Sequence, residues 1–274
     1  MKIKNIMIRV HPAVIFASIF FVFMGMSEIF FITFFFITIH EMAHITTALF
    51  FEGKISEIFI TPLGERCTIK NINSLSSIAK MLIIFSGPFV SILLGFILYY
   101  FFPKGGVMEF CSFINFSIGI FNLLPVLPLD GGAFLLVFFG RKKGVIYVGR
   151  KICILTKIIG IFITALGVIQ FAIYPFNISL FILGVFLWKK SKIEYMFLIS
   201  NFYSTIFNEK RIYGENPVEI RYIMSRKGEN MRRVIEKWNT EDYFITCWYE
   251  GDTLKYINQK EAIKRMLNES EFLI

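Results

Sequence analysis

Charged residues and paired cysteines are both scarce in this sequence of 274 residues. Only 18% of the residues are charged, whereas 55% are hydrophobic and the mean hydropathy is +0.63, which excludes an ordinary soluble domain. The four cysteines form no CxxC and keep no regular spacing, so neither a disulfide framework nor a cysteine zinc site is supported. The apolar stretch after Arg9 lacks a small-residue cleavage site, and no secretory signal peptide is expected. We therefore expect an integral membrane protein with free thiols in a reducing compartment.

Long apolar runs fill the first 190 residues, and a membrane-spanning helix needs about 20 such residues. The runs predict six transmembrane segments, at 10–27, 29–51, 81–102, 108–139, 152–173 and 176–190. The last two are expected to form a helical hairpin that turns at Tyr174-Pro175. Five spans are the alternative, and they would send the C-terminus to the other side of the membrane.

The placement of lysine and arginine favours six spans over five. With six spans and a cytoplasmic N-terminus, the basic residues face the cytoplasm and only Lys104 lies outside. We therefore predict a multi-pass membrane protein with both termini in the cytoplasm. The same asymmetry explains the net charge of +9 as a topology signal, so no nucleic-acid partner is expected.

The change from apolar to polar sequence predicts the domain organisation. We expect a membrane domain at 1–190, a basic helical linker at 191–212 and a cytoplasmic domain at 213–274. The pattern of the last part predicts a short apolar segment, an amphipathic helix, a strand, a turn and a helix, at 217–224, 230–238, 243–249, 251–252 and 259–268. The fold class is an α-helical polytopic membrane protein of about six transmembrane helices with a small C-terminal α/β domain.

Ionisable residues inside apolar spans are costly, and they therefore mark candidate functional sites. His40, Glu41 and His44 form an HExxH sequence in the second predicted span. Residues four apart share one face of a helix, so the two histidines can bind the same metal ion. Glu41 is adjacent to the first ligand and can reach a water molecule on the metal without binding the metal itself.

A catalytic zinc ion usually has three protein ligands and one open position, so one more donor is needed. Asp130 is the only aspartate before residue 242, and two prolines and two glycines around it are expected to break a helix inside the membrane. Broken backbone at that depth is tolerated where it lines a water-filled cavity. We predict that His40, His44 and Asp130 bind zinc; the alternative for Asp130 is to cap the helix that resumes at Gly131.

This set of residues predicts peptide hydrolysis. Zinc lowers the pKa of its bound water to about 7, Glu41 takes the proton, and the hydroxide attacks a peptide carbonyl. We assign substrate binding to Asn122 and Pro128, although Asn122 could instead join two helices. His11, at the start of the first predicted span, is expected at the membrane interface rather than at the metal.

At these residues the sequence resembles the site-2 protease family of intramembrane zinc metalloproteases. That family has HExxH on one span and a proline-containing LDG on a later one, here His40 to His44 and Leu129-Asp130-Gly131. The resemblance implies that His40, His44 and Asp130 are zinc ligands and that Glu41 is the catalytic base. It is strongest over 38–64 and 115–135 and weakens toward the C-terminus.

The resemblance is closer still to the members of the family that act in sporulation. It rests there on residues 122–132, on Ser86-Gly87-Pro88, and on a six-span core followed by one C-terminal domain. It implies cleavage of the pro-sequence of the sporulation factor pro-sigma-K, the outer forespore membrane of the mother cell as location, and inhibitory membrane partner proteins. It also implies that 213–274 is a cystathionine-β-synthase (CBS) domain able to bind ATP as a regulator. A single CBS motif is half of the usual pair, which predicts a homo-oligomer.

Residues 55–70 alternate apolar and polar side chains directly after the predicted metal-binding span. An extended segment there could pair with a substrate strand and hold it open for attack. The alternative is a surface loop packed on the bilayer.

Other functions stay open at this point. A site-2 protease could act on a different substrate, such as a membrane-anchored anti-sigma factor. A metal or proton transporter would also place His, Glu and Asp in mid-membrane, but we find no inverted repeat in the sequence. A catalytically silent scaffold would be expected to have lost Glu41 or a ligand, and none is lost.

Overall fold

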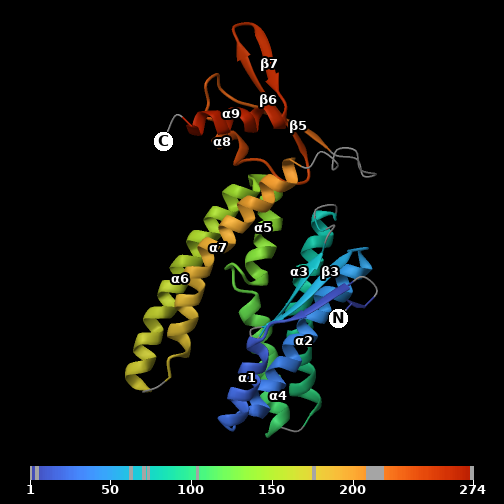
Figure 1. Ribbon diagram of the computed structural model, residues 1–274, viewed down its shortest axis with the longest axis vertical. Coiled ribbons are helices and arrows are strands. Elements are labelled where there is room, and N and C mark those ends of the chain that lie inside the picture. Colours follow the sequence, from blue (N-terminus) through green and yellow to red (C-terminus); the bar gives the residue numbers. More distant parts are fainter. Residues whose placement is uncertain are drawn as a thin grey trace. The chain divides into compact units, whose positions relative to one another are not determined.

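The computed structural model describes residues 2–3, 6–61, 64–69, 72, 75–102, 105–174, 177–207 and 219–271. The chain divides into two units (Figure 1). The first unit contains Met1–Leu124 and Leu129–Phe134, and the second contains Pro125–Pro128 and Leu135–Ile274.

The first unit holds a helical bundle and a small sheet. Its elements are β1 (Lys2–Ile3), β2 (Ile6–Val10), α1 (Ala13–Phe23), α2 (Ser27–Phe50), β3 (Ile55–Thr61), β4 (Gly64–Ile69), α3 (Ser77–Phe101), α4 (Val107–Asn122) and the start of α5 (Asp130–Lys143). The Ser76 side chain begins α3 by accepting a hydrogen bond from the Ala79 amide at 3.2 Å. Helix α3 packs against α2 on one side and α4 on the other, and it therefore supports both.

Glycines allow α3 and α4 to approach closely. A Cβ atom on Gly95 of α3 would lie 3.0 Å from the Phe116 ring, and one on Gly119 of α4 would lie 2.6 Å from the Ile92 side chain. Small residues at helix contacts are typical of membrane bundles, because association there depends on close packing.

The sheet of the first unit has the strand order β1-β2-β3-β4. Strand β3 pairs with β2 in parallel and with β4 in antiparallel, so its hydrogen bonds are used on both sides, whereas β4 lies at the edge. The predicted extended segment at 55–70 is confirmed for its described residues. Strand β2 was not predicted, because its partner β3 is about 50 residues away and its own apolar residues resemble the start of a span.

The second unit contains the rest of α5, α6 (Val145–Ile173), α7 (Ser179–Phe207), β5 (Ile220–Met224), α8 (Met231–Ile235), β6 (Tyr243–Glu250), β7 (Thr253–Ile257) and α9 (Gln259–Glu271). Helices α6 and α7 form the predicted hairpin. They pack closely because Gly167 of α6 lies directly against the backbone of Phe181, and Gly184 of α7 against Thr164. Helix α7 continues past residue 190 into the predicted linker, of which 208–212 lies outside the described residues.

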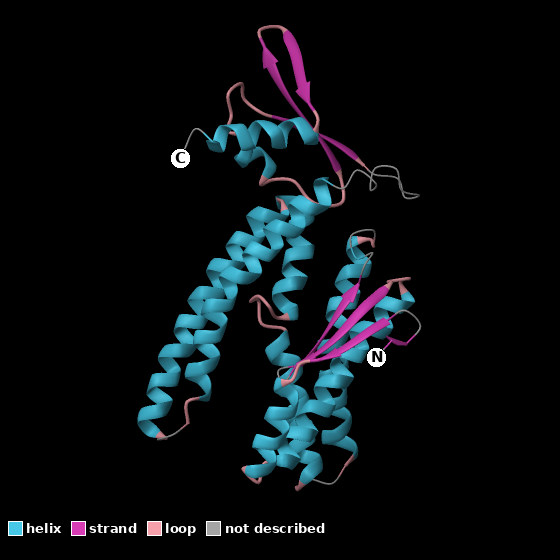
Figure 2. Ribbon diagram, viewed as in Figure 1, coloured by secondary structure: helices cyan, strands magenta, loops and turns pink. Residues whose placement is uncertain are grey.

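The C-terminal part of the second unit is a three-stranded sheet with helices α8 and α9 (Figure 2). Its predicted helices and the predicted strand at 243–249 are confirmed as α8, α9 and β6, with Gly251 in the β6–β7 turn at a φ of +62°. The segment at 217–224, predicted only as short and apolar, contains strand β5, and β7 was not predicted. The core of this part is built from the buried side chains Ile146, Phe202, Met231, Val234, Ile235, Trp238, Phe244, Ile257, Ala262 and Ile263. Two of them come from α6 and α7, so the small sheet shares its core with the long helices.

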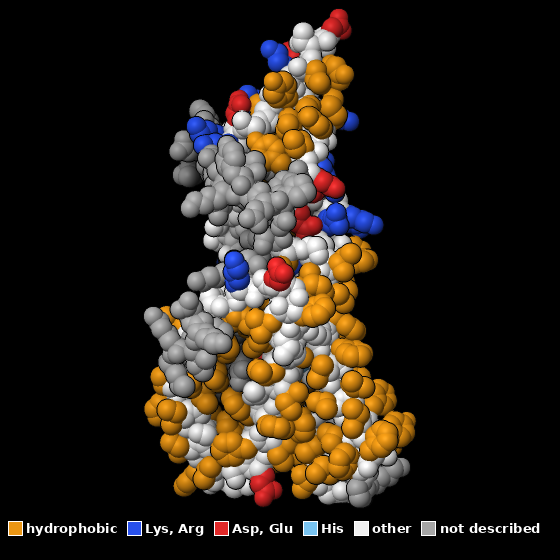
Figure 3. Space-filling model, turned by 90° about the vertical axis from the view of Figure 1, so that its right-hand side faces the viewer, with side chains coloured by type: hydrophobic (Ala, Val, Ile, Leu, Met, Phe, Trp, Pro, Cys, Tyr) orange, Lys and Arg blue, Asp and Glu red, His pale blue; other side chains and the backbone are white. Residues whose placement is uncertain are grey.

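Within the described residues, three helices are long and apolar enough to cross a membrane, namely α2, α3 and α6. Helices α1 and α4 are apolar but shorter, with 11 and 16 residues. The prediction of a membrane protein is therefore confirmed, whereas the count of six spans stays a prediction. The predicted interruption of the fourth span is found between α4 and α5. Hydrophobic side chains cover much of the helical surface, as expected for contact with lipid (Figure 3).

Candidate metal centre

The first unit brings His40, His44 and Asp130 together. The Nε2 atoms of the two histidines lie 3.2 Å apart, and the Asp130 Oδ2 atom lies 3.1 Å from the first and 3.3 Å from the second. One ligand atom from each residue lies within 4.8 Å of the others. Two imidazole nitrogens and one carboxylate oxygen therefore point at one small space.

Local structure explains how the three side chains meet. His40 and His44 lie one turn apart on α2, with ring centroids 4.9 Å apart. Asp130 is the first residue of α5, directly after the irregular stretch that follows α4. Gly131 is required there, because a Cβ atom on it would collide with the backbone carbonyls of Leu123 and Leu124.

Helix α3 orients both histidine rings. The His44 Nδ1 atom lies 2.7 Å from the Ile83 carbonyl oxygen, and His40 Nδ1 lies 2.9 Å from the Ser91 hydroxyl. A carbonyl can only accept, so His44 Nδ1 carries the proton and its Nε2 lone pair is left for a metal. Sequence reasoning missed Ser91, for which the available signal was a serine within the apolar run at 81–102. In the structure Ser91 is buried. The role of Ile83 could not be predicted from the sequence, because Ile83 acts through its backbone carbonyl and not through its side chain.

Gly87 leaves the space in front of the two Nε2 atoms open. A Cβ atom at this position would lie 2.7 Å from His40 Nε2 and closer still to His44 Nε2. Any larger residue at this point of α3 would fill the place of an ion.

The donor set suits zinc. Zinc in hydrolases is bound by imidazole nitrogens and a carboxylate oxygen, with a further position left for water or substrate. The His40 side chain is 3% exposed, whereas those of His44 and Asp130 are 13% and 24% exposed. The cluster is therefore closed on the His40 side and accessible near the other two ligands.

Glu41 lies on α2 between the two histidines and is partly exposed. Its carboxylate interacts electrostatically with His44 and with Cys67 of β4, a strand that packs against α2. Burial raises the pKa of the Cys67 thiol to about 11, and the nearby Glu41 charge contributes to that rise. The carboxylate and the edge strand therefore lie close together.

The remaining predicted residues lie as follows. Asn122 is the last residue of α4, and its amide nitrogen donates to the Ile118 carbonyl at 2.9 Å. Pro128 follows Leu127 through a cis peptide bond in the stretch before α5. His11 is exposed at the start of α1, where its Nδ1 accepts from the Ala13 amide, and it is not part of the metal-binding group.

Comparisons with known proteins agree with this geometry. Residues 105–166 match the model of peptidase family M50. Stage IV sporulation protein FB of Bacillus subtilis is 28% identical over 184 residues, which cover 66% of this chain and 62% of that protein. Zinc metalloprotease MJ0392 of Methanocaldococcus jannaschii is 24% identical over 163 residues, covering 57% and 47%. The chain thus spans less than two thirds of the length of both relatives.

A solved structure has the same fold. The site-2 protease from Methanocaldococcus jannaschii superposes with a TM-score of 0.55 and 23% sequence identity, covering 71% of this chain and 93% of that one. The donor set and these matches point to one class, the zinc metalloproteases of the site-2 type, to which the chain is similar. The resemblance seen in the sequence is thereby confirmed, and stage IV sporulation protein FB is among the relatives that support it.

Proposed function

We propose that this chain is an intramembrane zinc metalloprotease that cleaves a membrane-associated pro-protein. The observation that carries the proposal is the cluster of His40, His44 and Asp130, with Glu41 on the same helix. A cluster of this kind inside apolar helices needs a metal or water to satisfy it.

Each residue of the cluster has a role that follows from its chemistry. His40, His44 and Asp130 would hold the ion, and Ser91 would keep the His40 ring in place. Bound zinc supplies a water ligand of lowered pKa and polarises the carbonyl of the scissile peptide. Glu41 takes the proton from the attacking water and returns it to the leaving amine.

The proposed substrate is the pro-sequence of a pro-sigma-K-like sporulation factor. This proposal is supported by the similarity to stage IV sporulation protein FB and by the motif at 122–132. It includes the outer forespore membrane of a mother cell as location, both termini in the cytoplasm, and inhibitory membrane partner proteins. A membrane-anchored anti-sigma factor is the alternative substrate for the same chemistry.

We propose that the substrate is held in extended form along β4. This strand is at the edge of the described sheet, packs against α2, and carries Cys67 close to Glu41. Addition of a substrate strand would expose its peptide groups, which a helix shields from a nucleophile. Asn122 and Pro128, which shortly precede the metal ligand Asp130 in the sequence, are also proposed to contact the substrate.

The C-terminal part is proposed to be a CBS-like regulator that binds ATP and joins chains into a homo-oligomer. The sheet supports such pairing, because the face away from α8 and α9 is apolar and exposed (Figure 3). The exposed large apolar side chains of this sheet are Ile220, Tyr222, Met224, Tyr249, Leu254 and Tyr256.

The test is cleavage of a pro-sigma-K-like substrate by the purified chain and by Glu41→Gln, with zinc measured on both proteins. The expected result is about one zinc per chain in both and cleavage by the unmodified chain alone. Glu28→Gln is the matched control, since Glu28 lies exposed in the first turn of the same helix. Absence of zinc from both proteins would overturn the proposal, and zinc without cleavage would redirect it to another substrate.

A further inference from the structure

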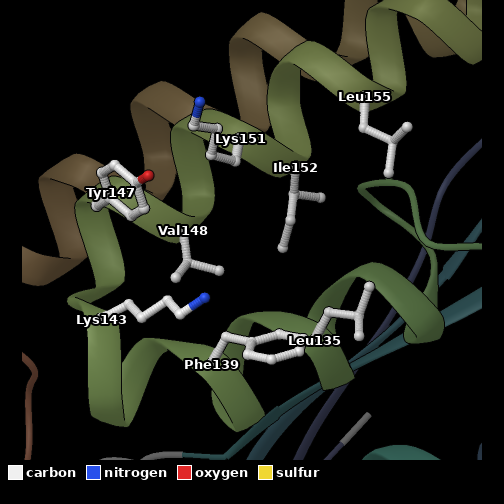
Figure 4. A pocket seen from close by; sticks show the side chains of 8 residues that line it. All are labelled: Leu135, Phe139, Lys143, Tyr147, Val148, Lys151, Ile152 and Leu155. Atoms are coloured by element: carbon white, nitrogen blue, oxygen red, sulfur yellow. The ribbon is translucent and has the colours of Figure 1, made fainter.

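A groove of about 350 Å³ lies between α5 and α6 in the second unit (Figure 4). It is lined by Leu135, Phe139 and Lys143 of α5 and by Tyr147, Val148, Lys151, Ile152 and Leu155 of α6. None of these residues belongs to the metal centre. The groove lies on α6, one of the helices long and apolar enough to cross a membrane.

The groove changes from basic to apolar along its length. On α5 its wall consists of Lys143, Phe139 and Leu135, four residues apart, so the cation is next to the turn at Gly144 and the leucine about 12 Å away. On α6 the corresponding wall ends in an apolar residue, Leu155. This polarity matches the boundary between the headgroups and the acyl chains of a bilayer.

The two lysines of the groove have no carboxylate partner among the residues that the structure describes. Within the described part of the chain, neither Lys143 nor Lys151 forms an ion pair, whereas the neighbouring Arg150 binds Glu236 at 2.9 Å. Figure 4 shows the Lys143 ammonium reaching into the groove, where it lies 5.4 Å from the Phe139 ring centroid. The Lys151 ammonium points away from the groove in this view and lies 5.8 Å from the Tyr147 ring centroid.

We propose that this groove binds one anionic glycerophospholipid of the surrounding bilayer. The lipid phosphate would lie beside Lys143 and the Tyr147 hydroxyl, Lys151 would turn toward it from the next turn of α6, and the start of one acyl chain would run along Phe139 and Leu155. The volume accommodates about a dozen groups the size of a water molecule, which is a headgroup with part of one chain. Basic pockets between membrane helices bind anionic headgroups by this combination of charge and apolar walls.

The experiment is a lipid titration of the full chain in detergent, followed by native mass spectrometry. Dioleoylphosphatidylglycerol is compared with dioleoylphosphatidylcholine, which has the same chains without net charge. We expect the anionic lipid to be retained about tenfold more strongly, and the double variant Lys143→Gln/Lys151→Gln to lose that preference. The matched control, Lys142→Gln/Lys157→Gln, removes the same charge from the same helices outside the groove and should keep it.

A second variant tests the apolar wall without changing charge. Leu155→Trp fills the groove, and Leu155 is 36% exposed, so the larger side chain does not have to enter the core. It should weaken retention of the anionic lipid severalfold while both lysines remain. Equal retention of the two lipids, equal loss in the control double variant, or full retention in Leu155→Trp would each overturn the proposal.

Discussion

At the scale of single residues, Gly87 decides whether the site can hold an ion. Gly87→Ala places a methyl group 2.7 Å from His40 Nε2 and closer to His44 Nε2, so we expect bound zinc to fall at least tenfold and cleavage to be lost. Leu93→Ala is the control on the same helix, because Leu93 is 45% exposed. Metal analysis of the purified variants measures the difference. One zinc per chain in Gly87→Ala would contradict the assignment.

Ser91 tests whether α3 orients the metal ligands. Ser91→Ala removes the hydrogen-bond partner of His40 Nδ1, and loss of such a partner typically lowers metal affinity about 10- to 100-fold. Competition with a fluorescent zinc chelator measures the affinity. Ser117→Ala serves as the control, since Ser117 is exposed and its hydroxyl donates to the Phe113 carbonyl of its own helix. Equal affinities in the two variants would argue against an orienting role.

The pH dependence of Cys67 alkylation reports on the surroundings of the edge strand β4. A thiolate is the reactive form, and a pKa of about 11 means that alkylation at pH 8 is slow and rises about tenfold per pH unit up to about pH 10. A free cysteine peptide, with a pKa of about 8.5, should level off above about pH 9. Mass spectrometry of the Cys67 peptide after iodoacetamide treatment gives both curves. A Cys67 curve that levels off with the peptide would show an unperturbed thiol.

The sequence predicts the metal ligands and the catalytic base better than the residues that surround and orient them. His40, Glu41 and His44 are recognisable because four residues of spacing are a local property of one helix, and Asp130 because it is the only early aspartate in an apolar chain. Gly87 lies on α3, next to the two histidines of α2. That contact depends on the packing of α3 against α2, which no local sequence pattern predicts.

At the scale of elements, the α6–α7 hairpin depends on glycines, whose lack of a side chain lets the two helices pack closely. Gly167→Ala would push a methyl group into the Phe181 backbone, so we expect a loss of about 1–3 kcal/mol in stability and a lower temperature of thermal inactivation. Val168→Ala is the control, because Val168 is 56% exposed on the same helix. Thermal unfolding in detergent compares the two, and equal midpoints would contradict the packing argument.

The elements also mark where prediction from sequence stops. Apolar runs predict helices because periodicity and length are local, and the hairpin and the break before Asp130 follow from proline and glycine. Strand β2 could not be predicted in the same way, because it depends on a distant partner. The helical linker at 191–212 was predicted and is found up to Phe207 as the continuation of α7. The burial of Phe202 in the C-terminal core was not predicted, because its contacts come from residues far along the chain.

At the scale of the whole molecule, the apolar sheet face predicts association between chains. Tyr222 of β5 and Tyr256 of β7 project from the face opposite α8 and α9, and they are 68% and 72% exposed. Exposed apolar surface of this kind is unfavourable in water unless a partner covers it. The full chain in detergent should therefore be a dimer or larger by light scattering, and Tyr222→Lys/Tyr256→Lys should be monomeric.

The control for this change is Lys264→Glu, which alters an exposed residue of α9 away from that face. It should leave the oligomer intact, because it adds no charge to the sheet surface. Zinc content should remain at about one per chain in all three proteins, since the sheet contributes no ligand to the metal centre. A monomeric unmodified chain, or an oligomer that survives both lysine substitutions, would mean that something other than a second copy covers these tyrosines.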